Sequence, residues 1–321
     1  MSAEAASVLV AKPGLLTTVQ DRGRWGSQSF GVSVSGAMDP YSHRLANVLT
    51  GNDVGAATLE VTIAGPELEF NDARIVAVTG ALFDVTIDDR PMAPRSAVEV
   101  SAGSILRFGR RLRGSRAYVA ISGGIETPAA FGSRATHLPS GIGGVDGRPL
   151  RSGDRLPLGA PARSPRPASR TPMADSNPVF TLPDGHATLR VLPGPQLDRF
   201  LPAAWDVLQS SSYRLANDSN RMGYRLAGPG LETPGRLEVI SDATPLGVLQ
   251  VPPSGQPILL MADRQTTGGY PKIAAVISAD ISMAAQLGPG DAVTFVACST
   301  QEALAALIAQ ERSLMAAAAR S

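Results

Sequence analysis

The densest group of chemically active side chains follows a short apolar run that ends at Met261. After Ala262 come Asp263, Arg264, Gln265, Thr266, Thr267, Gly268, Gly269, Tyr270, Pro271 and Lys272. Glycines let a ligand approach the backbone closely, and loops on rigid strands are where binding groups usually lie. We therefore expect a site here, with Asp263 as polar anchor or base, Arg264 as anion clamp and Gln265 as amide reader. The stretch 267–270 would contact the substrate.

Lys272 stands out because the chain uses arginine almost exclusively. Only Lys12 and Lys272 are lysines among the 29 Lys and Arg residues. The pKa of a lysine is set by its surroundings, whereas arginine is a permanent, forked charge. Perturbed amines often mark functional sites. We expect Lys272 to stabilise charge at the site. The alternative is an ordinary surface charge at the start of a strand.

A second polar, glycine-rich stretch spans residues 18–39, TVQDRGRWGSQSFGVSVSGAMD. Its candidate binding residues are Asp21, Arg24, Ser35 and Asp39, which precede a predicted helix. The N–H groups at the start of a helix suit an anion. In the alternative reading, Asp21 pairs with the arginines and Asp39 only caps the helix. We expect the stretch as a whole to bind substrate, and Asp39 by itself to act as a cap.

Three further residues outside these stretches could recognise a small amide or anion. Arg221 lies in NDSNRMGYR and could bind a carboxylate or phosphate with its forked donors. Gln250 and Gln256 flank a Pro-Pro-Ser-Gly turn and carry the paired donor and acceptor that match an amide. The alternatives are an ion-paired hairpin for Arg221 and a turn with solvent-facing amides for the two glutamines.

The bulk composition excludes several classes of function. A formal net charge of +1 gives no electrostatic case for nucleic acid or an anionic membrane. One cysteine, Cys298, and three dispersed histidines predict no metal site and suit a reducing cytoplasm. No secretion signal or membrane-length apolar run is visible, so we expect a cytoplasmic location. The arginine-rich segment 107–116 is expected to be a solvated hairpin tip.

Most of the chain alternates short Val-, Ile- and Thr-rich runs with turn residues, which predicts a mainly β fold. Some of the predicted strands are 7–12, 57–63, 73–79, 83–87, 105–108, 117–121, 188–192, 236–240, 247–251, 257–261, 274–277 and 292–297. The segment 161–184, rich in Pro, Ser and Arg, is predicted to link a domain at 1–160 to a second domain at 185–300.

Few helices are expected. Asp39 and Pro40 predict a helix that ends at Gly51, since Asp is a favoured N-cap and Pro a favoured first residue. Further helices are predicted over 196–208 and 280–288. The tail at 301–321 has helical composition, and we expect it either to pack on the second domain or to fray.

Several of these blocks, taken in order, resemble one family. They are TVQDRGRWG, GVSVSGAMD, ANVLTGN, VTGA, ISGGI, FGSRAT, LPGPQ, NRMGYRLAGP and QVPPSGQPILLMADRQTTGGYPKIA. The chain resembles, over roughly residues 7–298, the family known as allophanate hydrolase subunit 2 or biotin-dependent carboxyltransferase-like. The last block is long and specific.

The resemblance implies two cyclophilin-like β-barrel domains and an obligate companion, subunit 1. The first hypothesis it supports is the C subunit of an ATP-dependent 5-oxoprolinase, which opens 5-oxoproline to glutamate in a complex with a possible third subunit. ATP would act through the assembled complex, and biotin would not be carried on this chain. The alternatives are a carboxyltransferase subunit acting on urea or a related amide, and a non-catalytic regulatory binding subunit.

Overall fold

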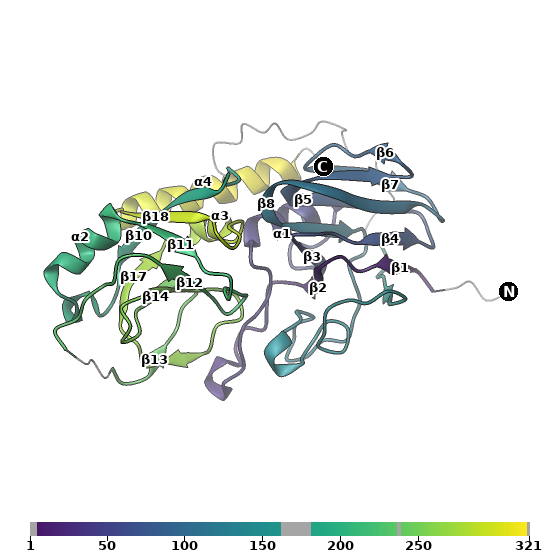
Figure 1. Cartoon of the computed structure of the whole chain (residues 1–321). Coiled ribbons are helices and arrows are strands. Elements are labelled where there is room, and N and C mark those ends of the chain that lie inside the picture. Colours follow the sequence, from purple (N-terminus) through teal and green to yellow (C-terminus); the bar gives the residue numbers. More distant parts are fainter. Residues whose placement is uncertain (1–4, 162–180, 236–238, 320–321) are drawn as a thin grey trace. The chain divides into compact units, whose positions relative to one another are not determined.

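The computed structural model describes residues 5–161, 181–235 and 239–319. The prediction of a mainly β fold with few helices is confirmed, and the chain forms two compact units (Figure 1). The predicted linker 161–184 lies largely outside the described residues. So do residues 236–238 of the strand predicted over 236–240, and Val239 and Ile240 are not in a strand. Among the described residues, no helix is both long and apolar enough to cross a membrane.

The boundary between the two units is not a single point in the sequence. Unit 1 comprises residues 1–24, 35–182 and 311–321, and unit 2 comprises 25–34 and 183–310. This differs from the simple order of two domains, a linker and a tail, because residues 25–34 belong to unit 2 and the end of the tail belongs to unit 1. The difference follows from long-range packing, which composition does not reveal.

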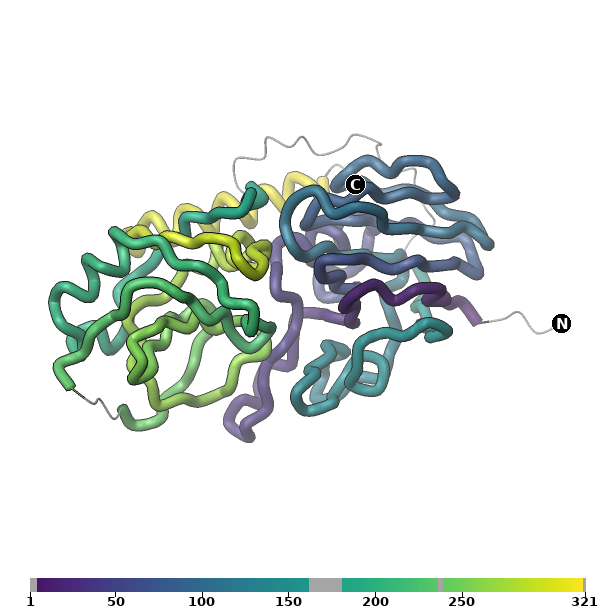
Figure 2. Tube along the Cα trace, in the orientation of Figure 1, coloured from purple at the N-terminus to yellow at the C-terminus, as the bar shows by residue number. Residues whose placement is uncertain are grey.

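Unit 1 is built on a nine-stranded, largely antiparallel sheet. Its strands are β1 (Ser7–Lys12), β2 (Leu16–Gln20), β3 (Thr58–Thr62), β4 (Glu67–Phe70), β5 (Arg74–Ile87), β6 (Arg90–Pro91), β7 (Ser96–Val100), β8 (Ile105–Ile121) and β9 (Arg155–Pro157). The main path runs β2-β3-β8-β4-β1-β9, and β5 joins β8 to β6 and β7. Figure 2 shows the long strands β5 and β8 curving together through unit 1.

β5 and β8 each merge two segments that the sequence predicts as separate strands. The register of their pairing shifts beyond Gly80, whose φ of 83° is accessible to glycine, so the strand bends there instead of ending. The arginine-rich segment 107–116 lies along β8, so its assignment to a hairpin tip was wrong. Buried side chains such as Val8, Leu59 and Leu106 form one core beneath the sheet.

Helix α1 (Pro40–Thr50) begins and ends where the sequence predicts. The Asp39 carboxylate accepts hydrogen bonds from the Ser42 backbone N–H at 2.9 Å and from the Ser42 hydroxyl at 2.6 Å. Gly51 ends the helix in the left-handed conformation at a φ of 72°. Leu45 and Val48 face a small core in unit 1.

Unit 2 is a closed barrel in the strand order β10-β17-β14-β15-β12-β11-β18, with a separate two-stranded ribbon β13-β16. Its strands are β10 (His186–Pro193), β11 (Ser212–Leu215), β12 (Gly223–Ala227), β13 (Asp242–Ala243), β14 (Val248–Gln250), β15 (Ile258–Leu260), β16 (Thr267–Gly268), β17 (Lys272–Val276) and β18 (Ala292–Ala297). Parallel pairing of β10 with β18 closes the ring. Alternation along β10 buries Ala187, Leu189 and Val191.

The other helices are shorter than predicted, apart from the last. They are α2 (Pro202–Ser210), α3 (Ile281–Ala284) and α4 (Thr300–Ala318). α2 begins at Pro202 because proline is favoured in the first turn of a helix, and a short 3-10 helix precedes it. The end of α4 neither frays nor packs on the second domain. Leu314 and Ala317 join the core around α1 in unit 1.

Candidate functional site

The strongest candidate site lies in unit 2, where β14, β15 and β17 meet the loop 261–271. Gln250 on β14 pairs in register with Lys272 on β17, so the two side chains emerge on the same face of the sheet. The loop that the sequence singled out connects β15 to β17 through the short strand β16. Three neighbouring strands therefore fix the ends of the segment that carries the polar side chains.

Arg221 and Asp263 form a buried ion pair. Arg221 Nε donates to Asp263 Oδ2 at 2.9 Å, and its Nη2 donates to Oδ1 at 3.0 Å. The two residues also share a backbone bond, from Asp263 N–H to the Arg221 carbonyl at 2.8 Å. Forked pairing of this kind fixes geometry as well as charge. In this arrangement, Arg221 holds Asp263 and thereby anchors the start of the loop.

Arg264 is directed at backbone carbonyls. Its Nε donates to the Thr244 carbonyl at 2.7 Å, and its Nη1 donates to the Met261 carbonyl at 3.4 Å. Burial lowers the pKa of Arg264 to about 10, partly offset by the charge of Asp263. The Ser33 hydroxyl, from the segment 25–34 of unit 2, donates to the Arg264 carbonyl at 2.9 Å. Arg264 therefore ties three chain segments together at the site.

Lys272 is a buried cation paired with an exposed anion. Its side chain is 1% exposed, whereas that of Asp242 is 60% exposed, and Nζ lies 3.1 Å from Asp242 Oδ2. The backbone N–H of Ala243 and the Lys272 ammonium both lower the pKa of Asp242. Asp242 lies on β13, which pairs with β16 through Asp242–Gly268 and Ala243–Thr267. The ribbon therefore brings a carboxylate to the lysine.

The LPGPQ block fixes the backbone of Lys272. Gln196 accepts a hydrogen bond from the Lys272 N–H at 3.1 Å through Oε1, and its own N–H donates to the Lys272 carbonyl at 3.3 Å. A Cβ at Gly194 would lie 2.2 Å from that same carbonyl, so only glycine fits without a shift. The block thus positions the lysine from the β10 side.

Two glutamines form a short amide chain beside the lysine. Gln265 Nε2 donates to Gln250 Oε1 at 3.1 Å, and Gln250 Nε2 donates to the Tyr270 carbonyl over a long 3.5 Å. A Cβ at Gly268 would lie 2.7 Å from Gln250 Nε2 and 3.2 Å from Gln265 Nε2. Gly268 therefore leaves room for these amides. Thr244, whose hydroxyl donates to the Gln265 carbonyl, holds the same loop.

The residues described so far form the unit 2 cluster, which comprises Gln196, Arg221, Asp242, Thr244, Gln250, Asp263, Arg264, Gln265 and Lys272. The remaining predicted residues of unit 2 lie at the margin of this cluster or outside it. Thr267 is exposed on β16, Gly269 follows it, and Tyr270 is half-exposed beside a groove of about 620 Å³ that is also bordered by Pro252 and Pro271. Gln256 makes two 3.0 Å bonds with the backbone of Gly228. It therefore closes a turn and is not joined to the Gln250–Gln265 chain.

The four predicted residues of the polar stretch 18–39 all lie in unit 1. Asp21 accepts from the Ser133 hydroxyl and the Arg134 N–H, both at 2.6 Å. Arg24 donates to the Ala135 carbonyl, and Ser35 donates to the Thr136 carbonyl at 3.1 Å. Asp39 caps α1. Through these contacts, the stretch holds the loop 130–136. None of the four residues lines either of the cavities described in unit 1.

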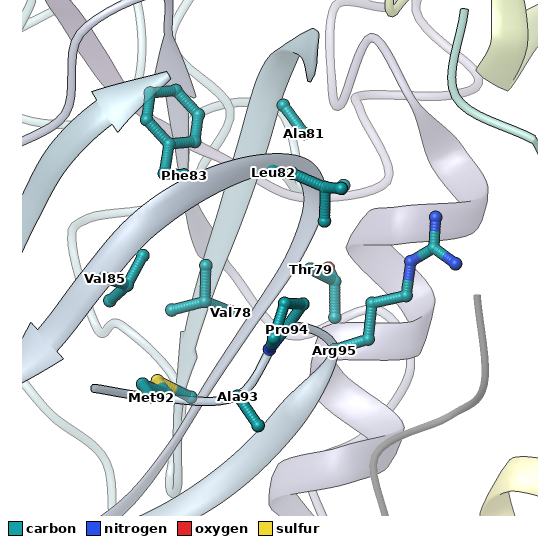
Figure 3. A pocket seen from close by; sticks show the side chains of 11 residues that line it. Val78, Thr79, Ala81, Leu82, Phe83, Val85, Met92, Ala93, Pro94 and Arg95 are labelled. Atoms are coloured by element: carbon teal, nitrogen blue, oxygen red, sulfur yellow. The ribbon is translucent and has the colours of Figure 1, made fainter. Parts of the chain in front are cut away.

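The cavities of unit 1 are poorly suited to an amide substrate. One lies beneath the bend of β5 and is lined by apolar side chains including Val78, Val85 and Met92, with the Arg95 guanidinium extending away from them (Figure 3). Its volume of about 10 Å³ is close to that of a single water-sized probe. A larger, open groove of about 880 Å³ runs beside β6 and β7, but it contains no predicted site residue.

Sequence reasoning missed three residues of the unit 2 cluster. Asp242 and Thr244 lie in a short stretch, SDATP, that has no periodicity and no unusual composition. Gln196 appeared only within the LPGPQ block. Asp242 and Thr244 lie beside the loop because the ribbon β13-β16 places them there, and no local pattern predicts this ribbon. Among the described residues, no group of three or more His, Cys, Asp or Glu side chains is placed to hold a metal ion.

Comparisons with known proteins bear out the resemblance seen in the sequence. The family model for the carboxyltransferase domain, subdomain A and B, matches residues 30–297. The chain is 41% identical to the C subunit of 5-oxoprolinase from Escherichia coli (strain K12) over 94% of this chain and 95% of the relative. It is 34% identical to the urea amidolyase of Lachancea kluyveri over 92% of this chain, but only 17% of that protein.

A solved structure agrees with these sequence relationships. The crystal structure of the K. lactis urea amidolyase superposes with a TM-score of 0.89 at 32% identity, covering 98% of this chain and 20% of that one. Both the family model and the bacterial relative extend over most of the sequence. The chain therefore belongs to the family of the carboxyltransferase domain, subdomain A and B.

Proposed function

We propose that this chain is the C subunit of an ATP-dependent 5-oxoprolinase complex that opens 5-oxoproline to glutamate. The observation that carries the proposal is the 41% identity to the C subunit of the E. coli 5-oxoprolinase, which extends over 94% of this chain and 95% of the relative. The urea amidolyase of L. kluyveri has a lower identity and corresponds to this chain over only 17% of its length.

The unit 2 cluster supports a role in binding and orienting a small amide. Gln250 and Gln265 offer amide donors and acceptors, and Lys272 offers a positive charge on the same face. The Arg221–Asp263 pair and Arg264 hold the loop, which reduces the motion of these groups. In this proposal the chain binds and orients the amide group of the lactam and stabilises charge on it.

ATP enters the proposal only through the assembled complex. A triphosphate needs several accessible donors, typically backbone N–H groups of a glycine-rich loop together with a free cation. The Lys272 ammonium is buried against Asp242, and Arg264 donates to backbone carbonyls. The cluster does not fit a triphosphate as it stands, so no phosphate-transfer step is assigned to it.

The second candidate function is carboxyl transfer to urea or a related amide. It is favoured by the match to the carboxyltransferase family model and by the superposition on a urea amidolyase. Urea also presents a planar amide to the same glutamines. The two functions differ in cofactor, because carboxyl transfer would require a biotin carrier supplied by another chain.

The test uses this chain co-purified with its companion subunits. We expect ATP-dependent release of glutamate from 5-oxoproline, unchanged by avidin, which sequesters biotin. Turnover of urea that avidin abolishes would instead establish carboxyl transfer. A stable complex that turns over neither substrate would contradict both enzyme functions and leave a regulatory binding role.

A further inference from the structure

We propose that the buried Lys272 ammonium is the binding site for a substrate carboxylate, and that Asp242 occupies this site in the free protein. The ligand class that follows is a small amide that carries its own carboxylate. This inference rests on the proposed function, since 5-oxoproline combines a lactam with a carboxylate, whereas urea has none.

The Lys272 ammonium requires a negatively charged partner. Lys272 Nζ has three donors, and within the described part of unit 2 Asp242 is the one side chain paired with it. A buried charge must keep a counter-ion, because water cannot solvate it. A ligand that displaces Asp242 must therefore bring a negative group to the same place.

Asp242 is only weakly held beside Lys272. Its carboxylate is largely exposed, so the ion pair is screened on one side by solvent. Its strand, β13, has two residues, and its pairing is confined to the equally short β16. The counter-ion of a fully buried cation is thus supplied by one of the least extensively paired strands of unit 2.

Two side-chain amides accompany Lys272 at the site. Gln250 is the cross-strand partner of Lys272, and Gln265 bonds to Gln250. Gln250 reaches the Tyr270 carbonyl over only a long contact of 3.5 Å, which a ligand amide could replace with a shorter one. A carboxylate on Lys272 thus places the amide of the same small molecule beside two side-chain amides.

The small number of lysines in the chain allows a direct test of this proposal. It contains two lysines, and Lys12 is a surface residue paired with Glu67 at 2.6 Å. Labelling the chain with lysine carrying ¹³C at Cε gives two side-chain NMR signals, and Lys12→Met assigns them. The probes are 5-oxoproline and 2-pyrrolidinone, which is the same lactam without the carboxylate.

We expect 5-oxoproline to shift the Lys272 signal and 2-pyrrolidinone to leave it in place at equal concentration, with Lys12 unmoved by both. In Asp242→Asn the internal competitor is gone, so the apparent affinity for 5-oxoproline should rise by roughly 3- to 10-fold. The proposal is overturned if both lactams shift the Lys272 signal equally, if neither does, or if Asp242→Asn weakens binding of 5-oxoproline.

Turnover by the assembled complex separates this inference from the proposed function. Lys272→Met should abolish the preference for 5-oxoproline over 2-pyrrolidinone, Lys272→Arg should retain part of it, and Lys12→Met should retain all of it. If the wild-type complex does not open 5-oxoproline but the Lys272 signal responds selectively, the function fails and the carboxylate site stands. If turnover occurs and Lys272→Met, folded as judged by its melting curve, keeps the full preference, the carboxylate site fails alone.

Discussion

Arg221 and Asp263 depend on each other at the base of the site loop, because each is buried with its charge met by the other. Removing one partner breaks a buried ion pair, and such changes cost about 3–5 kcal/mol. We therefore expect Arg221→Ala to lower the free energy of unfolding by that amount, measured by urea denaturation. The cost comes from the two hydrogen bonds that the Asp263 carboxylate loses and from the loop it anchors.

A matched control for this change lies four residues away. Arg225 pairs with Asp218 at 2.8 Å, but both side chains are more than half exposed, so Arg225→Ala should cost less than about 1 kcal/mol. Equal losses for the two variants would contradict the distinction between a buried and a solvated pair. A small loss for Arg221→Ala combined with a large loss of activity would instead assign Arg221 a direct role in binding substrate.

At the scale of single residues, the sequence identified the polar residues of the site loop. It did not identify the partners that these residues contact. Gln265 bonds to Gln250, the cross-strand partner of Lys272, and Asp263 and Arg264 hold the start of the same loop. The Lys272 ammonium pairs with Asp242, which is 30 positions away in the sequence. Local spacing carries no information about a pairing of that range, and the catalytic and binding roles stay predictions.

At the scale of elements, α1 carries a titratable group whose burial affects stability. His43 is fully buried in α1, where its Nε2 lies 3.1 Å from the Ala56 carbonyl, the geometry of an N–H donor in the neutral ring. Burial lowers the pKa of His43 to about 4 from the usual 6.5, although Asp21 acts in the opposite direction. The folded protein therefore resists protonation of this ring.

The sign of the pH dependence follows from this shift. Between pH 6.5 and 4 the unfolded chain takes up a proton at His43 and the folded chain does not, so stability falls as the pH falls. The contribution of this one ring is about 3 kcal/mol over that window. In His43→Gln, the free energy of unfolding should decline less between pH 7 and 4 by that amount. An identical decline in both proteins would rule out the histidine as its source.

Elements with strong local signals were predictable, and those that depend on distant pairing were not. α1 has a cap, a proline and a terminal glycine, and its bounds match the prediction. β5 and β8 contain glycines that read as strand ends. They continue because each is paired with the other along its length, with register shifts that absorb the irregularity. The ribbon β13-β16 gave no signal, since each of its strands is two residues long.

At the scale of the whole molecule, the path of the chain departs most from what the sequence suggests. Unit 2 includes the segment 25–34, and unit 1 includes the residues from 311 onward. Composition locates a linker, but it does not reveal that two segments belong to the unit encoded by the other half of the sequence. α4 therefore contributes residues to both units, and its last turns belong to the core of unit 1.

The last turns of α4 are joined to α1 by both polar and apolar contacts. Arg44 donates to both carboxylate oxygens of Glu311, at 2.5 and 2.7 Å, and the hydroxyls of Tyr41 and Ser313 lie 2.9 Å apart. Leu314 is buried in the same cluster as Leu45. The end of the helix thus covers an apolar face of α1 that would otherwise meet water.

Two adjacent positions of α4 test this packing. Leu314→Ala removes a buried side chain and should lower the free energy of unfolding by about 2–5 kcal/mol, because a cavity is left against α1. Met315→Ala alters a neighbour that is 71% exposed and should change it by less than about 0.5 kcal/mol. Urea denaturation followed by circular dichroism measures both.

Both tryptophans, Trp25 and Trp205, lie in unit 2, so their fluorescence tells whether unit 2 unfolds in the same transition. Similar effects for the two substitutions would mean that the end of α4 does not complete unit 1, because a frayed helix end would tolerate both equally.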